Sequence, residues 1–135
     1  VPAACALLAL ACTGAGNLRR IRQFGREGRG RYLDAVKFIA ANSGPETTVG
    51  SGHDFAHRMM LEFYGSYVPG VRMRYVPRDR WGPDAPEWAI VHLDRRGHRP
   101  VEELTAASGG RYVFQEEFRT SEHVGWDWFL YRRAR

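Results

Sequence analysis

The sequence predicts an α/β domain of Rossmann-like type, with three α/β/α layers and a mixed, mostly parallel sheet of about five strands. Two observations lead to this fold class. Segments with helical periodicity alternate with short apolar runs typical of strands, and such alternation implies crossover connections between parallel strands. The 135 residues are enough for one domain with a hydrophobic core and too few for two.

The first half of the domain predicts two helices around one strand. Residues 32–44 place apolar side chains at i, i+4, i+7 and i+8, one face of a helix, and a Gly-Pro pair ends it. Residues 47–51 predict a short strand. Residues 53–67 are helical again, and their large apolar side chains are expected to form the buried face: Phe55, Met59, Met60, Phe63, Tyr64 and Tyr67.

The second half predicts more strand than helix. The expected elements, in order, are a strand over 71–76, a proline-rich loop over 77–86, a strand over 87–93, a helix over 101–110 closed by glycines, and strands over 111–118 and 126–133. The run at 87–93 is nearly all apolar, as in a strand covered on both faces. The last two strands are close enough in sequence to form an antiparallel edge.

The N-terminal part differs from the body in charge and hydropathy. Residues 1–17 begin with an uncharged apolar run that predicts the end of a truncated membrane span, and a signal-peptide or lipoprotein-signal interpretation competes with it. Residues 18–31 form a basic arm that leads into the single domain at 32–135. The first 32 residues carry the whole net charge of +5. This arrangement favours anionic lipid as a partner and argues against nucleic acid, whose binding domains carry basic patches on the folded body.

The stretch from residue 49 to residue 59 contains the order H-D-x-x-H at His53, Asp54 and His57. It is one carboxylate type away from the H-E-x-x-H signature of zinc hydrolases. A third ligand would be needed, and His92 is one of the available histidines. The alternative is that Asp54 complements the positive end of the helix dipole while the histidines lie at the surface. We expect no metal and no cofactor, and a metallohydrolase is the least favoured function.

The same stretch also predicts an anion site. Gly50 and Gly52 flank Ser51 where a strand turns into a helix, and the free N–H groups of a helix start attract phosphate. Ser51 would add a hydroxyl group, and His53 and Arg58 would add charge. The alternative is that the glycines only permit a tight turn. A small soluble module that binds a phosphate-bearing ligand here is therefore the second functional hypothesis.

Trp81 lies in the proline-rich loop. Core packing is the default for an aromatic side chain. The alternative places Trp81 and Trp126 on an exposed rim against lipid headgroups or a partner, and Trp81 is the better candidate of the two. Neither cysteine lies in the body, and no Ser-based or Cys-based catalytic triad is supported. The binding or interface candidates are therefore Ser51, His53, Asp54, His57, Arg58, Trp81 and His92, and no catalytic residue is assigned.

Four stretches together show a family resemblance: GRGRYLDAVKFIA, VGSGHDFAHRMMLEFY, PEWAIVH and GWDWFLYRR. With the apolar start and the basic arm, they resemble the C-terminal extramembrane domain of bacterial multi-pass membrane glycosyltransferases of the GT-C type. This class is related to protein mannosyltransferases and lipid-A aminoarabinose transferases. The resemblance covers about the whole chain, although none of the four stretches is a catalytic signature.

The resemblance implies a parent enzyme that transfers a sugar from a polyprenyl-phosphate donor at the outer face of the bacterial cytoplasmic membrane. The catalytic carboxylate of that family lies in loops between earlier spans, so no catalytic residue is implied here. The expected partners are the membrane, the rest of the enzyme and the polyprenyl-phosphate sugar. The arginines after the apolar run favour the cytoplasmic side by the positive-inside rule, whereas the resemblance implies the extracytoplasmic side.

Overall fold

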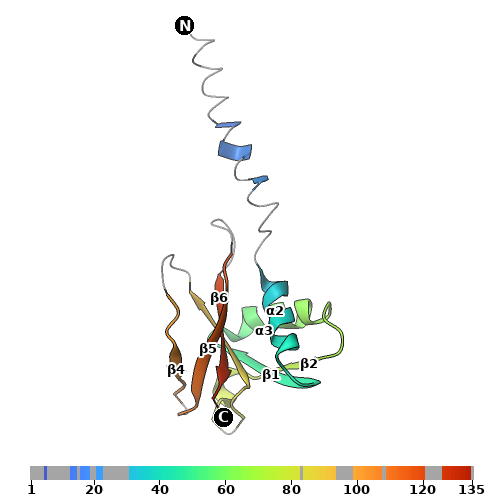
Figure 1. Cartoon of the computed structure of the whole chain (residues 1–135), viewed down its shortest axis with the longest axis vertical. Helices are drawn as coiled ribbons and strands as arrows, with labels where there is room; N and C mark the ends of the chain where they lie inside the picture. Colours follow the sequence, from blue (N-terminus) through green and yellow to red (C-terminus); the bar gives the residue numbers. More distant parts are fainter. Residues whose placement is uncertain are drawn as a thin grey trace.

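The computed structural model describes residues 5, 13–14, 16–18, 21–22, 31–82, 84–93, 99–107, 109–120 and 126–134. Its elements in chain order are α2 (Tyr32–Ala41), β1 (Glu46–Ser51), α3 (Asp54–Gly65), β2 (Arg72–Tyr75), the 3-10 turn η1 (Arg78–Arg80), β3 (Trp88–Leu93), β4 (Glu103–Thr105), β5 (Arg111–Phe118) and β6 (Asp127–Arg133). Helices α2 and α3 pack together beside one twisted sheet (Figure 1).

No helix in the described part of the chain is both long enough and apolar enough to cross a membrane. Most of residues 1–17 lie outside the described residues, so the predicted end of a span is not tested. The boundaries between this segment, the basic arm and the domain also stay predictions.

All six strands form one mixed sheet in the order β2-β1-β3-β6-β5-β4. Strand β1 pairs in parallel with β2 and β3, and the pairs β3–β6, β6–β5 and β5–β4 are antiparallel. The α/β class is confirmed, but the prediction of a Rossmann-like, mostly parallel sheet of about five strands is wrong. Strands β4, β5 and β6 follow one another through connections too short for a crossover, and such connections join antiparallel neighbours.

The predicted helix over 101–110 is also wrong. This segment contains β4, which pairs with β5. The N–H of Ala106 donates to the carbonyl of Gly110 at 2.8 Å, and Gly109 adopts a positive φ of 83°, a conformation that favours glycine. The Glu-Glu-Leu-Thr-Ala-Ala run has good local helix propensity. Pairing with β5 and packing of Leu104 on the sheet override that propensity.

Buried side chains form two clusters on opposite faces of the sheet, because neighbouring residues of a strand point in opposite directions. The cluster under the helices consists of Tyr32, Ala35, Val36, Ile39, Val49, Leu61, Trp88, Ile90, Phe118, Trp128 and Leu130. The second cluster is smaller and consists of Ala89, Tyr112, Phe129 and Tyr131, with Trp81 and Phe114 packed against it. Both described helices contribute to the first cluster, so the expected third layer of helix does not cover the second.

A β-bulge lets one strand serve both clusters. Phe114 of β5 pairs with Tyr131, but Glu116 pairs with Leu130, so Gln115 is one extra residue. The extra residue reverses which face the later side chains meet. As a result Tyr112 packs in the second cluster while Phe118 packs under the helices.

The connection from β2 to β3 crosses the face opposite α3 without a helix. It carries η1 and then Trp81, which packs in the second cluster and donates its indole N–H to the carbonyl of Val76 at 3.1 Å. A Cβ at position 50 would lie only 2.7 Å from two atoms of the Trp81 indole. Gly50 therefore serves close packing of an aromatic side chain against β1.

Candidate functional site: a histidine cluster at one end of the sheet

Three histidines meet at the carboxyl ends of the parallel strands β1 and β3. The ring centroids of His57 and His92 are 4.9 Å apart, those of His53 and His92 are 5.7 Å apart, and those of His53 and His57 are 6.0 Å apart. His53 immediately precedes α3, His57 lies in its first turn, and His92 lies near the end of β3. The carboxyl ends of parallel strands are the usual location of ligand sites in α/β sheets.

His57 is the buried member of the cluster. Its side chain is fully buried, and neither ring nitrogen has a hydrogen-bond partner. Burial, with smaller contributions from His92 and His53, lowers its pKa from 6.5 to about 4, so the ring is neutral at pH 7. The interpretation that the histidines lie at the surface is therefore wrong for His57.

Two tryptophans from the start of β6 complete the cluster. The Trp126 ring lies 5.1 Å from His92 and 5.4 Å from His53, and the buried Trp128 ring lies 5.1 Å from His57, measured between centroids. The β3–β6 ladder pairs His92 directly with Trp128. The rings of three histidines and two tryptophans therefore pack together at this end of the sheet.

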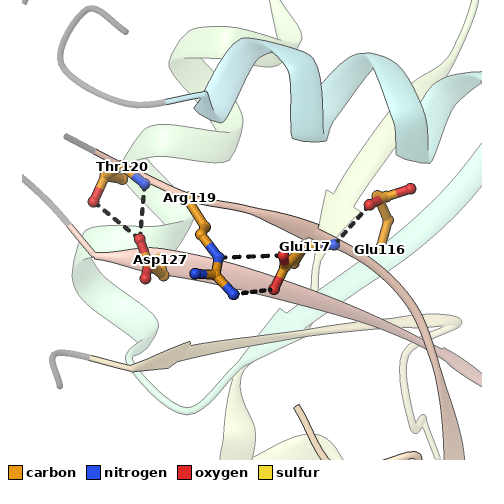
Figure 2. A network of polar contacts seen from close by, with 5 residues as sticks. All are labelled: Glu116, Glu117, Arg119, Thr120 and Asp127. Carbon is orange, nitrogen blue, oxygen red and sulfur yellow. Dashed lines mark hydrogen bonds and ion pairs between the residues drawn. The ribbon is translucent and has the colours of Figure 1, made fainter. Parts of the chain in front are cut away.

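Polar contacts hold the start of β6 in place. The hydroxyl of Tyr32, the first residue of α2, accepts the N–H of Trp126 at 2.9 Å and lies 3.3 Å from the Trp126 carbonyl. Figure 2 shows that the backbone N–H and the hydroxyl of Thr120 both donate to Asp127, at 2.7 and 3.2 Å. The same view shows Arg119 forming a two-pronged contact with Glu117 along β5. The contacts of Tyr32 with Trp126 and of Thr120 with Asp127 hold the start of β6, and so Trp126, beside the histidines.

The Gly-Ser-Gly turn is occupied by an internal hydrogen-bond chain. The N–H of His53 donates to the Ser51 hydroxyl at 3.0 Å, and the Ser51 and Tyr75 oxygens are 2.9 Å apart. The Tyr75 hydroxyl donates to Asp54 at 2.8 Å. Since the single Tyr75 proton goes to a carboxylate, Ser51 donates to Tyr75. Burial and the Asp54 carboxylate raise the pKa of Tyr75 to about 12, which keeps this donor protonated.

This chain bears on both functional hypotheses for the stretch. The Asp54 carboxylate also accepts the N–H of Arg78, at 3.2 and 3.3 Å, so it is bound to Tyr75 and Arg78 on the β2 side of α3. In a zinc hydrolase the corresponding carboxylate would instead act as the base beside the metal. A phosphate at the turn would meet this carboxylate at the start of α3, where a fixed negative charge opposes anion binding.

Arg58 and Trp81 lie apart from the histidine cluster. Arg58 forms an exposed ion pair with Glu62 at 2.9 Å, one turn further along α3. It borders a groove of about 500 Å³ between α3 and β2, which also contains the carboxylates of Asp54 and Glu62. The residues that line this groove are Asp54, Phe55, Arg58, Met59, Glu62, Tyr75 and Pro77. Trp81 is half-buried on the other face of the sheet, where it packs on Tyr112. The structure thus brings together three of the seven candidates, namely His53, His57 and His92.

Helix α3 turns a different face to the sheet than the sequence predicts. Its buried residues are Ala56, His57 and Leu61, while Phe55, Met59 and Phe63 are 78%, 55% and 57% exposed. Tyr67, just after the helix, is 61% exposed. These four side chains follow one another at intervals of four residues, and we call them the α3 stripe. The prediction that all large apolar side chains of this helix are buried is wrong for the stripe.

Sequence reasoning left Trp126, Trp128 and Tyr75 out of the candidate residues. Trp126 and Trp128 flank Asp127 at the start of the last predicted strand, and the period-2 pattern could have placed them at a strand end. The sequence holds no signal that β6 pairs with β3, because that pairing joins distant segments, from Leu93 with Asp127 to Trp88 with Arg132. Within the described residues, no group of three or more His, Cys, Asp or Glu side chains is arranged to hold a metal ion as it stands.

Comparisons of the chain with family models, with curated proteins and with solved structures find no match. The functional interpretation therefore depends on the geometry described above and on the four stretches that carry the sequence resemblance.

Proposed function

We propose that the chain is a non-catalytic extramembrane domain of a bacterial membrane glycosyltransferase that transfers a sugar from a polyprenyl-phosphate donor. In this proposal the domain lies on the extracytoplasmic face of the cytoplasmic membrane, and the α3 stripe is the surface it turns toward the membrane. The observation that carries the proposal is the stripe itself, since a row of four large apolar side chains with exposed fractions above one half is unusual on a monomeric protein.

The composition of the stripe supports a membrane surface as its partner. Phenylalanine, methionine and tyrosine are side chains that insert at the boundary between headgroups and acyl chains. The rings of Phe63 and Tyr67 contact each other at 5.4 Å, which gives the end of the stripe a continuous aromatic surface. Arg58 lies beside the stripe in α3, is exposed, and pairs with Glu62 at 2.9 Å.

The N-terminal part of the sequence supports contact with a membrane, although its arginines favour the cytoplasmic face and the family resemblance alone favours the extracytoplasmic one. Residues 1–13 carry no charge, and the net charge of +5 lies in the residues that follow, up to residue 32. Each basic residue near an anionic membrane contributes about 1 kcal/mol to binding. The arm meets the folded body at Tyr32, which is bonded to Trp126, so the histidine cluster lies at the end of the domain where the arm joins.

The alternative, a soluble phosphate-binding module, has weaker support. The Ser51 hydroxyl already forms hydrogen bonds with the His53 N–H and with Tyr75. Asp54 places a carboxylate at the start of α3, and Arg58 is paired with Glu62. Calorimetric titration with phosphate, nucleotides and polyprenyl phosphate separates the two functions. Saturable phosphate binding that Arg58→Ala abolishes would favour the module.

A probe attached to the stripe tests the membrane contact. In a chain with Cys5→Ser and Cys12→Ser, Met59→Cys carries an environment-sensitive fluorophore, and Val101→Cys is the matched control because Val101 is equally exposed outside α3. Vesicles of phosphatidylglycerol and phosphatidylethanolamine should shift the emission of the Met59 probe to the blue and leave the Val101 probe unchanged. Equal shifts, or no shift at position 59, would contradict the proposed contact.

Two observations test the link to a glycosyltransferase. The chain by itself should transfer no sugar from a polyprenyl-phosphate donor, and measurable turnover would contradict a non-catalytic role. The full-length gene product should contain a series of apolar spans before Val1. A start codon immediately upstream of Val1 would overturn the proposal even if the probe at position 59 contacts lipid.

A further inference from the structure

Strand β2 is an open edge of the sheet, and some of its main-chain groups face outward. It stands first in the order β2-β1-β3-β6-β5-β4, so within the described sheet β1 is its one neighbour. The N–H of Arg72 donates to the carbonyl of Pro45 at 2.8 Å, on the β1 side. Because the hydrogen-bonding direction alternates along a strand, the N–H and C=O groups of Met73 and Tyr75 point away from β1. Such groups are a template for a further strand.

A groove of about 500 Å³ lies beside this edge, between α3 and β2. Phe55 and Met59 line its α3 wall with side chains that are 78% and 55% exposed, and Pro77 lines it just after β2. The two carboxylates in the groove already have hydrogen-bond donors within the protein. A side chain of an added strand that points toward α3 would enter this groove. The groove therefore favours apolar side chains at alternate positions of the added strand.

The other face of β2 is basic. Arg72 and Arg74 point away from α3, because side chains alternate along a strand and Met73 packs under the helices. The exposed guanidinium of Arg74 forms no hydrogen bond or ion pair with any described residue, and Arg72 contacts the exposed Glu46 at only 3.6 Å. This face favours acidic side chains between the apolar ones. The hollow of about 320 Å³ here is lined by Glu46, Thr47, Thr48, Arg72 and Arg74.

We propose that an extended peptide segment with alternating apolar and acidic side chains adds to the edge of β2 as a further strand. Its main chain pairs with the outward N–H and C=O groups of Met73 and Tyr75. Its apolar side chains enter the groove beside α3, and its acidic side chains face Arg72 and Arg74. In this mode of recognition the main-chain hydrogen bonds give affinity, and the alternate side chains give specificity.

The arginines also decide against a second copy of this chain as the added strand. In a symmetric pair of β2 strands, side chains of the same face oppose each other across a twofold axis, so Arg74 would meet Arg72 or Arg74 again. Like charges directly opposite each other destabilise a strand pair. The same charges attract an acidic peptide, so the edge is selective for a segment of opposite charge.

A labelled peptide of alternating valine and glutamate, with blocked ends and long enough to span β2, is the probe. Its fluorescence anisotropy should show saturable binding to the full chain, and a peptide of alternating valine and lysine should bind at least about 10-fold more weakly. No saturable binding of the glutamate peptide, or equal affinity for the lysine peptide, would overturn the proposal.

Two N-methylated analogues of the glutamate peptide test the main-chain contact. One is methylated at every valine and the other at every glutamate. Only alternate N–H groups of an added strand face β2, so one analogue should lose binding and the other should keep it. Equal affinities of the two analogues would show that the peptide adheres by charge alone and does not pair with the strand.

The variant Arg74→Glu locates the site. It changes an exposed side chain, so the protein should fold, while the affinity for the glutamate peptide falls about 3- to 10-fold and that for the lysine peptide rises. Arg111→Glu is the matched control, because Arg111 is exposed on β5 and three strands separate β5 from β2. It should bind as the parent does. Unchanged binding in Arg74→Glu, or equal losses in both variants, would contradict binding at β2.

The inference goes beyond the proposed membrane role and is tested separately from it. The groove shares Phe55 and Met59 with the α3 stripe, whereas Arg74 and the main chain of β2 lie outside the stripe. The blue shift of the Met59 probe with vesicles should therefore persist in Arg74→Glu. Loss of the peptide with the vesicle shift intact would support strand addition, and loss of both would show that Arg74→Glu acts on the whole surface.

Discussion

The two ends of strand β3 differ in whether the polar side chains beside them have hydrogen-bond partners. At the start of β3, the carboxylate of Glu87 accepts hydrogen bonds from Arg132 at 2.7 Å and from the Thr47 hydroxyl at 2.8 Å, and its N–H donates to Thr48 at 2.9 Å. At the other end, His57 packs among aromatic rings with both nitrogens unpartnered.

This difference separates a structural polar group from a candidate functional one. The donors to the Glu87 carboxylate lie on strands β1 and β6, so this side chain links three strands. Both of its oxygens have a hydrogen-bond donor within the protein. Within the described residues, no group forms a hydrogen bond with either ring nitrogen of His57. The stability of the folded protein should therefore depend on whether this ring is protonated. Three predictions test the comparison.

The largest expected effect is on the pH dependence of stability. The pKa of His57 is about 4 in the folded state and 6.5 when unperturbed, so the unfolded chain binds the proton more tightly. The folded state is therefore destabilised as the pH falls below 6.5, and the loss levels off near pH 4 at about 3 kcal/mol. Urea unfolding at a series of pH values, in a metal-free buffer, measures this loss.

His57→Leu is the control for the carboxylates, which titrate in the same range. The variant lacks the imidazole, so its free energy of unfolding should depend less steeply on pH between 6.5 and 4 than that of the parent. Parallel pH curves for the two proteins would show that His57 does not supply the difference.

A smaller effect on the free energy of unfolding is expected at the start of β3, where Glu87 is hydrogen-bonded. Arg132→Met should lower the free energy of unfolding by about 1–2 kcal/mol, because the half-buried Glu87 loses a charged hydrogen-bond donor and Trp88 loses the guanidinium over its ring. Arg72→Met is the comparison, since Arg72 contacts Glu46 at 3.6 Å with both side chains largely exposed. Its effect in urea unfolding should stay within about 0.5 kcal/mol. A larger loss for Arg72→Met than for Arg132→Met would reverse this assignment.

The smallest expected effect separates two buried tryptophans of the same cluster. Trp88 donates its indole N–H to Ser43 at 2.8 Å, whereas the indole N–H of Trp128 has no partner. Trp88→Phe and Trp128→Phe lose similar volumes, and only the first also loses a hydrogen bond. Trp88→Phe should therefore be more destabilising by about 1 kcal/mol in chemical denaturation. Equal losses would mean that Trp128 has a donor contact of similar value.

Local patterns predicted the local elements. The helical spacing of residues 32–44 and 53–67 found α2 and α3, and the Gly-Ser-Gly turn was correctly placed between a strand and a helix. Residues 101–110 failed because helix propensity is weak compared with strand pairing. The buried face of α3 was misassigned because size was taken as a sign of burial. The buried residues are the small Ala56, the polar His57 and Leu61, and only Leu61 among them is a large apolar side chain.

The histidine cluster was predictable only in part. The i, i+4 spacing of His53 and His57 was visible in the sequence, and His92 was named as one available partner. Its closeness to His57 depends on β1 pairing with β3, a contact between distant segments that periodicity does not encode. The burial of His57 likewise depends on Trp128, which β6 brings next to β3.

The hydroxyl of Tyr32 joins the two ends of the described domain. It accepts the N–H of Trp126, a residue 94 positions further along the chain, at the point where the arm becomes helix α2. The first residue of α2 and the start of the last strand are therefore joined by one side chain, because the Tyr32 hydroxyl lies within hydrogen-bond distance of both the N–H and the carbonyl of Trp126. Tyr32→Phe would remove this link while leaving the aromatic ring in the core.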